Sequence, residues 1–170
     1  VGRNKMGRRR GCCRVKLTKA TEADLPVLEK WLENENTRKL IQVEPPNMSL
    51  PSVVYMIRLD DDTPVGYVTL YNIDTERKNA DAGIVIPDKR GRGLSHIAGR
   101  ILLRAAFSED WLGLERVRLK VLRTNRIARR LAELFGFVEE GMERKVAIYN
   151  GQREDVYIYG LLKSEFEGGI

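Results

Sequence analysis

Residues 81–95 combine residue types that could bind a phosphate group. A short apolar run ends at Pro87, passes through a basic loop and leads into a sequence with helical periodicity. The loop contains three cations and two glycines, Lys89, Arg90, Gly91, Arg92 and Gly93. Glycine has no Cβ to keep a ligand from the backbone, and the first turn of a helix offers N–H groups without helical partners. The alternative is an ordinary strand-to-helix connection with solvated arginines.

The chain has 170 residues, 42% of them hydrophobic, which fits one domain with a substantial core. We expect residues 14–170 to form this domain. No apolar run reaches the ~20 residues needed to span a bilayer, and the first residues lack a signal-peptide pattern, so we expect no membrane partner and a cytoplasmic location. Adjacent Cys12 and Cys13 have no His or Cys partners at metal spacing, which indicates free thiols and no metal site.

The net charge of +6 and the pI near 9.4 come largely from the N-terminal end of the chain. Residues 1–13 form a basic tail that we expect to be disordered, while the rest of the chain is nearly balanced. Clustered Lys and Arg can bind nucleic acid, but this is the least favoured partner. A basic balance also suits an acidic nucleotide cofactor.

Alternating and apolar runs predict about seven strands, at residues 14–18, 53–59, 65–71, 80–86, 116–122, 137–149 and 154–162. Helical periodicity predicts about four helices, at 21–34, in a short stretch within 36–51, at 94–110 and at 125–135. The helix at 94–110 should bury Leu94, Ile97, Ala98, Ile101, Leu102 and Ala105. The predicted fold class is α/β (α+β), a mixed sheet with an antiparallel N-terminal part and a parallel strand pair in the middle.

Two blocks separated by one strand resemble the GNAT family of N-acetyltransferases. Residues 90–95, Arg-Gly-Arg-Gly-Leu-Ser, are similar to the acetyl-CoA loop of that family, an Arg or Gln followed by x-x-Gly-x-Gly or Ala. The second block has the spacing of the family's asparagine helix and its terminal Gly-Phe: Asn125, Ala128, Leu131, Gly136 and Phe137. Residues 149–162 further resemble the hairpin of the branch that includes polyamine, ribosomal-protein and sugar-nucleotide acetyltransferases. The resemblance covers residues 15–166.

The resemblance implies that the two middle strands splay apart around residues 84–86 and 119–122, and that acetyl-CoA lies in the gap. The pantetheine amides would complete backbone hydrogen bonds left open there, and the pyrophosphate would rest on the N–H groups of residues 90–95. The implied cofactor-binding residues are Ile84, Val85, Ile86, Arg90, Gly91, Arg92, Gly93, Leu94, Ser95, Asn125 and Arg129. Asn125 has an alternative role as an N-cap, since Asn is among the best helix caps.

An amine acceptor favours a catalytic base, because an alkyl amine with a pKa of ~10.4 costs ~4 kcal/mol to present unprotonated at neutral pH. Asp81 is the leading candidate, since it begins the strand beside the thioester and matches a position where related enzymes often carry a carboxylate. The alternative is a polar residue at the start of a strand that faces solvent. Asp74 and Glu76, in the preceding polar link, are weaker candidates.

The general acid for the leaving thiolate departs from the family pattern. The position seven residues after Asn125, commonly Tyr in the family, is Ala132 in this chain. Tyr149 is the predicted acid, with Tyr157 and Tyr159 as alternatives, and packing is the competing role for each phenol. Without a phenol, the thiolate leaves unaided or through water.

The functional prediction is an acetyl-CoA-dependent N-acetyltransferase that acts on a primary amine, such as a polyamine or a protein N-terminus, by direct attack in a ternary complex. Acidic residues around the expected acceptor side suit a cationic amine: Glu33, Glu35, Glu44, Asp74, Glu76 and Asp81. Basic residues there suit a nucleotide-sugar: Arg38, Lys39, Arg77 and Lys78. The alternatives are a non-catalytic acetyl-CoA-binding regulatory module, which Ala132 keeps open, and a nucleic-acid binder. The strand edges leave a homodimer open.

Overall fold

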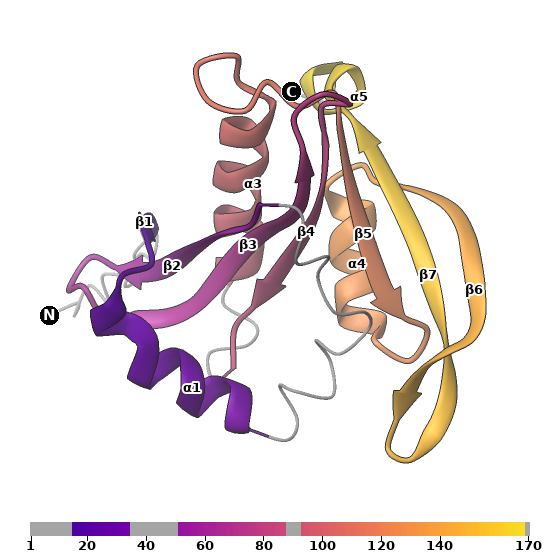
Figure 1. Ribbon diagram of the computed structural model, residues 1–170, viewed down its shortest axis with the longest axis horizontal. Coiled ribbons are helices and arrows are strands. Elements are labelled where there is room, and N and C mark those ends of the chain that lie inside the picture. The colour runs from indigo at the N-terminus through magenta and orange to yellow at the C-terminus, as the bar shows by residue number, and fades with distance from the viewer. Residues whose placement is uncertain (1–14, 35–50, 88–92, 169–170) are drawn as a thin grey trace, which may run out of the picture.

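Seven strands form one mixed sheet in the order β1-β2-β3-β4-β5-β7-β6 (Figure 1). The computed structural model describes residues 15–34, 51–87 and 93–168. The strands are β1 (Val15–Lys19), β2 (Val53–Leu59), β3 (Pro64–Asp74), β4 (Asn79–Val85), β5 (Arg116–Leu122), β6 (Val138–Tyr149) and β7 (Gln152–Leu162). The helices are the 3-10 turn η1 (Glu22–Asp24) and the α-helices α1 (Leu25–Glu33), α3 (Leu94–Phe107), α4 (Arg126–Leu134) and α5 (Lys163–Gly168).

The strand pairing confirms the predicted mixed sheet. Strands β1 to β4 pair antiparallel with their neighbours in sequence. Strands β4 and β5, which helix α3 connects, pair parallel. Strand β7 pairs antiparallel with both β5 and β6. Helix α5 was not predicted. The expected helix within residues 36–51 and the expected tail at residues 1–13 lie outside the described residues.

The two faces of the sheet carry different helices. Helices α3 and α4 lie against one face, and α1 lies on the other (Figure 1). Because side chains alternate along a strand, Ile57, Val68 and Ile84 join the core on the α3 side, whereas Met56 and Tyr67 pack with Trp31 of α1. Each strand of this part of the sheet is therefore packed on both faces.

Helix α3 fills the main core, although its buried face is rotated from the predicted one. Its buried residues are Leu94, Ala98, Gly99, Leu102, Leu103, Ala106 and Phe107. Ile101, predicted to be buried, is 37% exposed, and Ile97 and Ala105 are half-buried. The rotation follows from packing beyond the sheet, because Phe107 contacts Phe166 of α5 and Gly99 lies against the ring of Phe135.

Candidate active site

Strands β4 and β5 pair over only three residues before they separate. The paired residues are Asn79 with Arg116, Ala80 with Val117, and Asp81 with Arg118. Strand β4 continues to Val85 and β5 to Leu122, and Figure 1 shows the two strands diverging toward these ends. We call this divergence the fork, with residues 82–85 as its β4 arm and 119–122 as its β5 arm. The facing backbone groups of the arms have no strand partner in the described chain, so an amide-bearing ligand could bind there.

The N-terminus of α3 provides the second part of the site. Gly93 is its N-cap, with a φ of 71°, in the left-handed region that favours glycine. The first helical hydrogen bond at this end runs from the N–H of Ile97 to the carbonyl of Gly93, at 3.1 Å. A Cβ added to Gly93 would have no heavy atom of the described chain within 4 Å, so the backbone here is open to a ligand.

The other predicted loop residues divide into two groups. Leu94 buries its side chain in the core at 2% exposure, so it can offer a ligand only its backbone, and Ser95 is half-buried. Arg90, Gly91 and Arg92 lie outside the described residues.

The β4 arm carries the predicted apolar contacts. Ile84 and Ile86 are half-buried and pack against the α3 core, while Val85 packs against the cluster under α1. Gly66 of β3 lies directly beside this arm, because a Cβ at Gly66 would be 2.2 Å from the carbonyl oxygen of Val85. The absence of a side chain at Gly66 therefore sets the position of the arm.

Asn125 and Arg129 lie at the start of α4. Asn125 is its N-cap, and the side-chain Oδ1 accepts a hydrogen bond from the N–H of Ala128 at 3.1 Å, so the alternative capping role is present. The Nε of Arg129 donates to the hydroxyl of Tyr159 at 3.3 Å, and the guanidinium lies 4.3 Å from the ring centre of Tyr157. The hydrogen bond with Tyr159 raises the pKa of Arg129.

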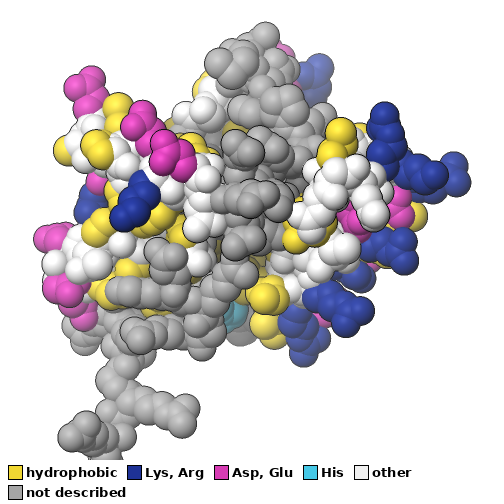
Figure 2. Space-filling model, turned by 90° about the horizontal axis from the view of Figure 1, so that it is seen from below, with side chains coloured by type: hydrophobic (Ala, Val, Ile, Leu, Met, Phe, Trp, Pro, Cys, Tyr) yellow, Lys and Arg dark blue, Asp and Glu magenta, His cyan; other side chains and the backbone are white. Residues whose placement is uncertain are grey.

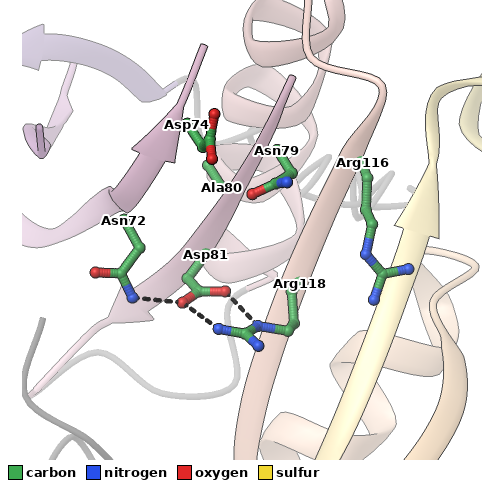
Figure 3. Close-up of a pocket in the computed structure, with 7 residues that line it drawn as sticks. All are labelled: Asn72, Asp74, Asn79, Ala80, Asp81, Arg116 and Arg118. Carbon is green, nitrogen blue, oxygen red and sulfur yellow. Dashed lines mark hydrogen bonds and ion pairs between the residues drawn. The ribbon is translucent and has the colours of Figure 1, made fainter. Parts of the chain in front are cut away.

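Asp81 lies at the apex of the fork and is buried, with 3% of its surface exposed. Oδ1 accepts a hydrogen bond from Nε of Arg118 at 2.5 Å, and Oδ2 accepts from Nη2 of Arg118 at 2.8 Å and from Nδ2 of Asn72 at 2.7 Å (Figure 3). The solvent-facing alternative for Asp81 is therefore wrong. Asp81 belongs to a polar pocket of about 340 Å³ on the sheet face opposite α3, lined by Asn72, Asp74, Asn79, Ala80, Asp81, Arg116 and Arg118.

The weaker base candidates are placed less favourably. Asp74 lines the pocket, but its carboxylate accepts from the backbone N–H of Arg77 at 2.9 Å and from the Arg77 guanidinium at 2.7 Å. These contacts, the backbone one first, hold the pKa of Asp74 below its ordinary value. Glu76 is exposed in the turn between β3 and β4.

The structure does not bring Tyr149 to Asp81. Tyr149 pairs with Gln152 of β7, whereas Arg118, the partner of Asp81, pairs with Gly160. These β7 positions are eight residues apart, or about 26 Å at ~3.3 Å per residue. Tyr149 instead packs with the small cluster at the end of the β6–β7 hairpin.

The alternative phenols are occupied elsewhere. The hydroxyl of Tyr159 donates to Glu139 at 3.4 Å, and Tyr157 lies against Arg129. Ala132 is 1% exposed within the main core, where it contributes only packing.

Three residues at the fork were missed from the sequence. Arg118 and Asn72 hold Asp81, and Tyr71 of β3 pairs directly with it. The Cε1 atom of Tyr71 lies 4.0 Å from the Cβ position of Gly83, so the ring leans toward the β4 arm. Arg118 lies in the strand predicted at residues 116–122, but its contact with Asp81 depends on the β4–β5 register, which no short pattern encodes.

The sheet is mixed, its parallel β4–β5 pair separates after three residues, and the glycine-capped helix α3 connects the two strands. A sequence model of the acetyltransferase (GNAT) domain matches residues 14–138. The chain belongs to the acetyltransferase (GNAT) domain family, as its sequence resemblance indicated.

Relatives and solved structures agree with this family. Over 111 residues the chain is 36% identical to the putative ribosomal N-acetyltransferase YdaF of Bacillus subtilis, covering 65% of this chain and 60% of that protein. Over 116 residues it is 27% identical to the L-amino acid N-acetyltransferase AaaT of Escherichia coli, covering 66% of this chain and 70% of that protein. The fold matches spermidine N-acetyltransferase from Vibrio cholerae in complex with CoA and spermine, with a TM-score of 0.82 at 23% identity, over 90% of this chain and 98% of that one.

Among residues 15–34, 51–87 and 93–168, no helix is long and apolar enough to cross a membrane. No group of three or more His, Cys, Asp or Glu side chains among them could hold a metal ion.

Proposed function

We propose that the protein is an N-acetyltransferase that moves the acetyl group of acetyl-CoA to a primary amine, by direct attack in a ternary complex. The observation that carries this proposal is the fork, where two parallel strands leave backbone donors and acceptors open in front of the α3 N-terminus. Family membership supports it, as do relatives named as a putative ribosomal N-acetyltransferase and an L-amino acid N-acetyltransferase. The solved relative with CoA and spermine suits a polyamine acceptor.

The residues present fit acetyl-CoA. The β4 arm would hydrogen-bond the pantetheine amides, with Ile84, Val85 and Ile86 as its apolar wall. The first N–H groups of α3, next to Gly93, would hold the pyrophosphate, because a helix N-terminus attracts anions. Acetyl-CoA would supply an acetyl group activated as a thioester. We keep Arg90, Gly91, Arg92, Leu94, Ser95, Asn125 and Arg129 as proposed cofactor contacts.

The residues proposed to accept the amine proton and to protonate the leaving thiolate lie on the polar face of the sheet. Asp81 lies at the apex of the fork, where a carboxylate can accept the amine proton through water. Its existing hydrogen bonds occupy both oxygens, so water relay suits it better than direct contact. For the acid, the position of Tyr71 beside the β4 arm favours it over Tyr149.

A non-catalytic acetyl-CoA-binding module is the second candidate function. The specific observation in its favour is Ala132, which lies in the core where family members commonly have the acidic phenol. Such a protein would bind acetyl-CoA tightly and turn over no amine. A nucleic-acid role would have to rest on the basic residues 1–13, which lie outside the described residues.

Residues 14–170 are proposed to act as one domain, because a single sheet includes every strand from β1 to β7. A homodimer is proposed through the outer edge of the sheet, since β6 is a long edge strand with exposed apolar side chains.

The proposed function is tested by release of CoA thiol with a panel of amines: spermidine, spermine, free amino acids, an N-terminal peptide and an amino sugar nucleotide. Turnover with at least one amine is expected. Tight acetyl-CoA binding without turnover on any of them would support the non-catalytic module instead.

The cofactor site is tested by Gly93→Val. The branched side chain covers the α3 N-terminus, so we expect acetyl-CoA affinity to fall about tenfold or more, which corresponds to the loss of ~1.4 kcal/mol in binding. Gly151→Val is the matched control, because Gly151 has a similar φ of 75° in the β6–β7 turn. The Gly151→Val variant should lose as much stability as Gly93→Val but keep the wild-type affinity for acetyl-CoA. Equal affinities for Gly93→Val and wild type, measured by calorimetry, would place the cofactor elsewhere.

A further inference from the structure

We propose that the ion pair between Asp81 and Arg118 is a clamp that fixes where β4 and β5 separate, and so determines how deeply the acyl end of acetyl-CoA enters the fork. This inference rests on the proposed function for its catalytic consequence. It gives Asp81 and Arg118 a positioning role, because they act through the strands that carry them. For Asp81 this role is an alternative to the water-relayed base proposed above, and the test below distinguishes the two.

The register places the ion pair at the last paired position. Asp81 and Arg118 are the third and final pair of the parallel ladder, and the arms separate at the next residue of each strand. The side chains of the two residues lie on the same face and meet across the strands (Figure 3). A tie at this position opposes both separation of the last pair and any sliding of one strand along the other.

The geometry of the ion pair is specific. Two parallel hydrogen bonds, of 2.5 and 2.8 Å, join the guanidinium to both carboxylate oxygens, and Asn72 of β3 adds a third at 2.7 Å. Such bidentate pairs fix orientation as well as distance. The Asp81 side chain is only 4% exposed, so loss of its partner would leave a carboxylate buried without its counter-charge.

The neighbouring cations of β5 show that this connection differs from the others. Arg116 pairs with Glu140 and Lys120 pairs with Glu143, and both of these acids lie on β6. Those two pairs therefore tie β5 to β6 across β7. Arg118, between them, reaches the other way and joins β5 to β4, across the boundary at which the sheet opens.

A change in the branch point changes the site directly. Gain or loss of one residue pair in the β4–β5 ladder moves the point of separation by about 3.3 Å along the strands. Misplacement of reacting groups by only about 1 Å can lower the rate about 100-fold. The contacts proposed for the pyrophosphate, at the N-terminus of α3, would be unaffected. Loss of the clamp should therefore lower kcat strongly, and it should weaken CoA binding only through the pantetheine contacts of the arms.

The test uses the full chain and four variants: Asp81→Asn, Arg118→Met, Arg118→Lys and the charge swap Asp81→Arg with Arg118→Asp. For Asp81→Asn and Arg118→Met we expect similar losses of kcat, about 10- to 100-fold, because each breaks the same positioning contact. Arg118→Lys keeps the charge and should recover part of the loss. The charge swap should have a higher kcat than Asp81→Asn or Arg118→Met, although it removes the carboxylate from β4.

A second readout needs no turnover. Amide hydrogen exchange in the peptides covering the fork arms, 82–85 and 119–122, should increase in Asp81→Asn and Arg118→Met and return toward wild type in Arg118→Lys. The dissociation constant for CoA, from calorimetry, should rise by a smaller factor than kcat falls, because only the pantetheine contacts of the arms shift. Asp24→Asn is the matched control, since Asp24 is also buried against an arginine, Arg58 of β2, but away from the fork. It should change neither kcat nor exchange in the arms.

The outcomes separate the clamp from a catalytic base. Loss of kcat in Asp81→Asn with full activity in Arg118→Met would overturn the clamp and support a base. Unchanged exchange in the arms of both Asp81→Asn and Arg118→Met would also overturn it. A wild-type protein without turnover on any amine would contradict the proposed function alone, because the exchange experiment would still decide the clamp.

Discussion

Asp24 and Asp81 are the two carboxylates buried in the described part of the chain, and an arginine from a neighbouring strand holds each of them. Asp24 accepts hydrogen bonds from the backbone N–H and the hydroxyl of Thr21 and pairs with Arg58. The N–H of Thr21 first, and then Arg58, hold its pKa below the ordinary value against the opposing effect of burial. Asp24 thus ties the start of α1 to the sheet.

Asp24→Asn should lower the free energy of unfolding at neutral pH by about 1–3 kcal/mol, as expected for loss of a partly buried charged hydrogen bond. Because the pKa is lowered on folding, the stabilisation by Asp24 is present above the unfolded pKa of ~3.9 and is lost as the pH falls through the folded value. The variant should therefore lose stability less steeply than wild type below about pH 4. Urea unfolding between pH 2.5 and 7 measures both effects.

Asp62→Asn is the control for that titration. Asp62 also has a lowered pKa, caused first by its hydrogen bond with Lys16, but both side chains are largely exposed. Exposed pairs contribute little to stability, so this variant should follow the wild-type curve. If the free energy of unfolding fell equally steeply below about pH 4 in Asp24→Asn and in wild type, the titration of Asp24 would not be coupled to folding.

Tyr71→Phe tests the phenol beside the β4 arm. If this phenol protonates the leaving group, kcat should fall about 100-fold or more, as is usual for loss of a general acid, while the affinity for acetyl-CoA is unchanged. Tyr149→Phe should remain close to wild type, since Tyr149 lies at the far end of β7. Steady-state kinetics that show the reverse order would restore Tyr149 as the acid.

At the scale of elements, Gly66 of β3 determines where the β4 arm lies. A methyl group there would collide with the carbonyl of Val85, a backbone atom that cannot rotate away. Gly66→Ala should therefore displace the arm, lower stability by about 1–3 kcal/mol as overpacking does, and weaken acetyl-CoA binding. Gly141→Ala in β6 is the control, because no heavy atom of the described residues lies within 4 Å of its Cβ position. Thermal unfolding and calorimetry report the two effects, and an unaffected Gly66→Ala would mean that the arm yields easily.

The sequence predicted the elements well because the helices and β5 have a periodic apolar face and the central strands, packed on both faces, are continuous apolar runs. The alternation in β5 and the strand-helix-strand order were enough to predict the parallel pair. The rotation of α3 was not predictable, since it depends on Phe135 and Phe166, which come from other elements. Helix α5 was not predicted from the sequence, because six residues are too few to establish a helical period.

The sequence predicted the helix starts next to the candidate site, which depend on local spacing, but it did not predict the contacts that depend on strand register. The glycine that caps α3 and the asparagine that caps α4 were visible as spacing. The environment of Asp81 was not, because Asn72, Arg118 and Asp81 come from three strands and meet only once the sheet forms. The same holds for the separation of Tyr149 from Asp81, which appears only in the β5–β7–β6 register.

At the scale of the whole molecule, the homodimer proposed above would form through the outer edge of the sheet. Strand β6 lies at this edge, and its exposed apolar side chains are Val138, Met142, Val146 and Ile148. In Figure 2, basic side chains gather on the right side of the view. Long apolar edges tend to pair with another chain.

Val146→Lys with Ile148→Lys should therefore shift the protein toward the monomer in sedimentation velocity. Charged side chains on an edge strand oppose pairing with a second copy. Ile127→Lys, on the exposed surface of α4, is the control and should leave the association state unchanged. A wild-type protein that stays monomeric at all concentrations would contradict self-association through β6.

The short β4–β5 ladder also determines the order in which the sheet forms and comes apart. Asn79 and Arg116 are 37 residues apart, and only three pairs reward the closure of that loop, whereas β2–β3 and β6–β7 are adjacent hairpins. The two hairpin-rich halves should therefore form first and join late. Asp81→Asn should then accelerate unfolding and leave the folding rate nearly unchanged, which a chevron plot would show as a shift of the unfolding limb alone. The opening proposed for acetyl-CoA should then also be the seam at which the native protein separates first.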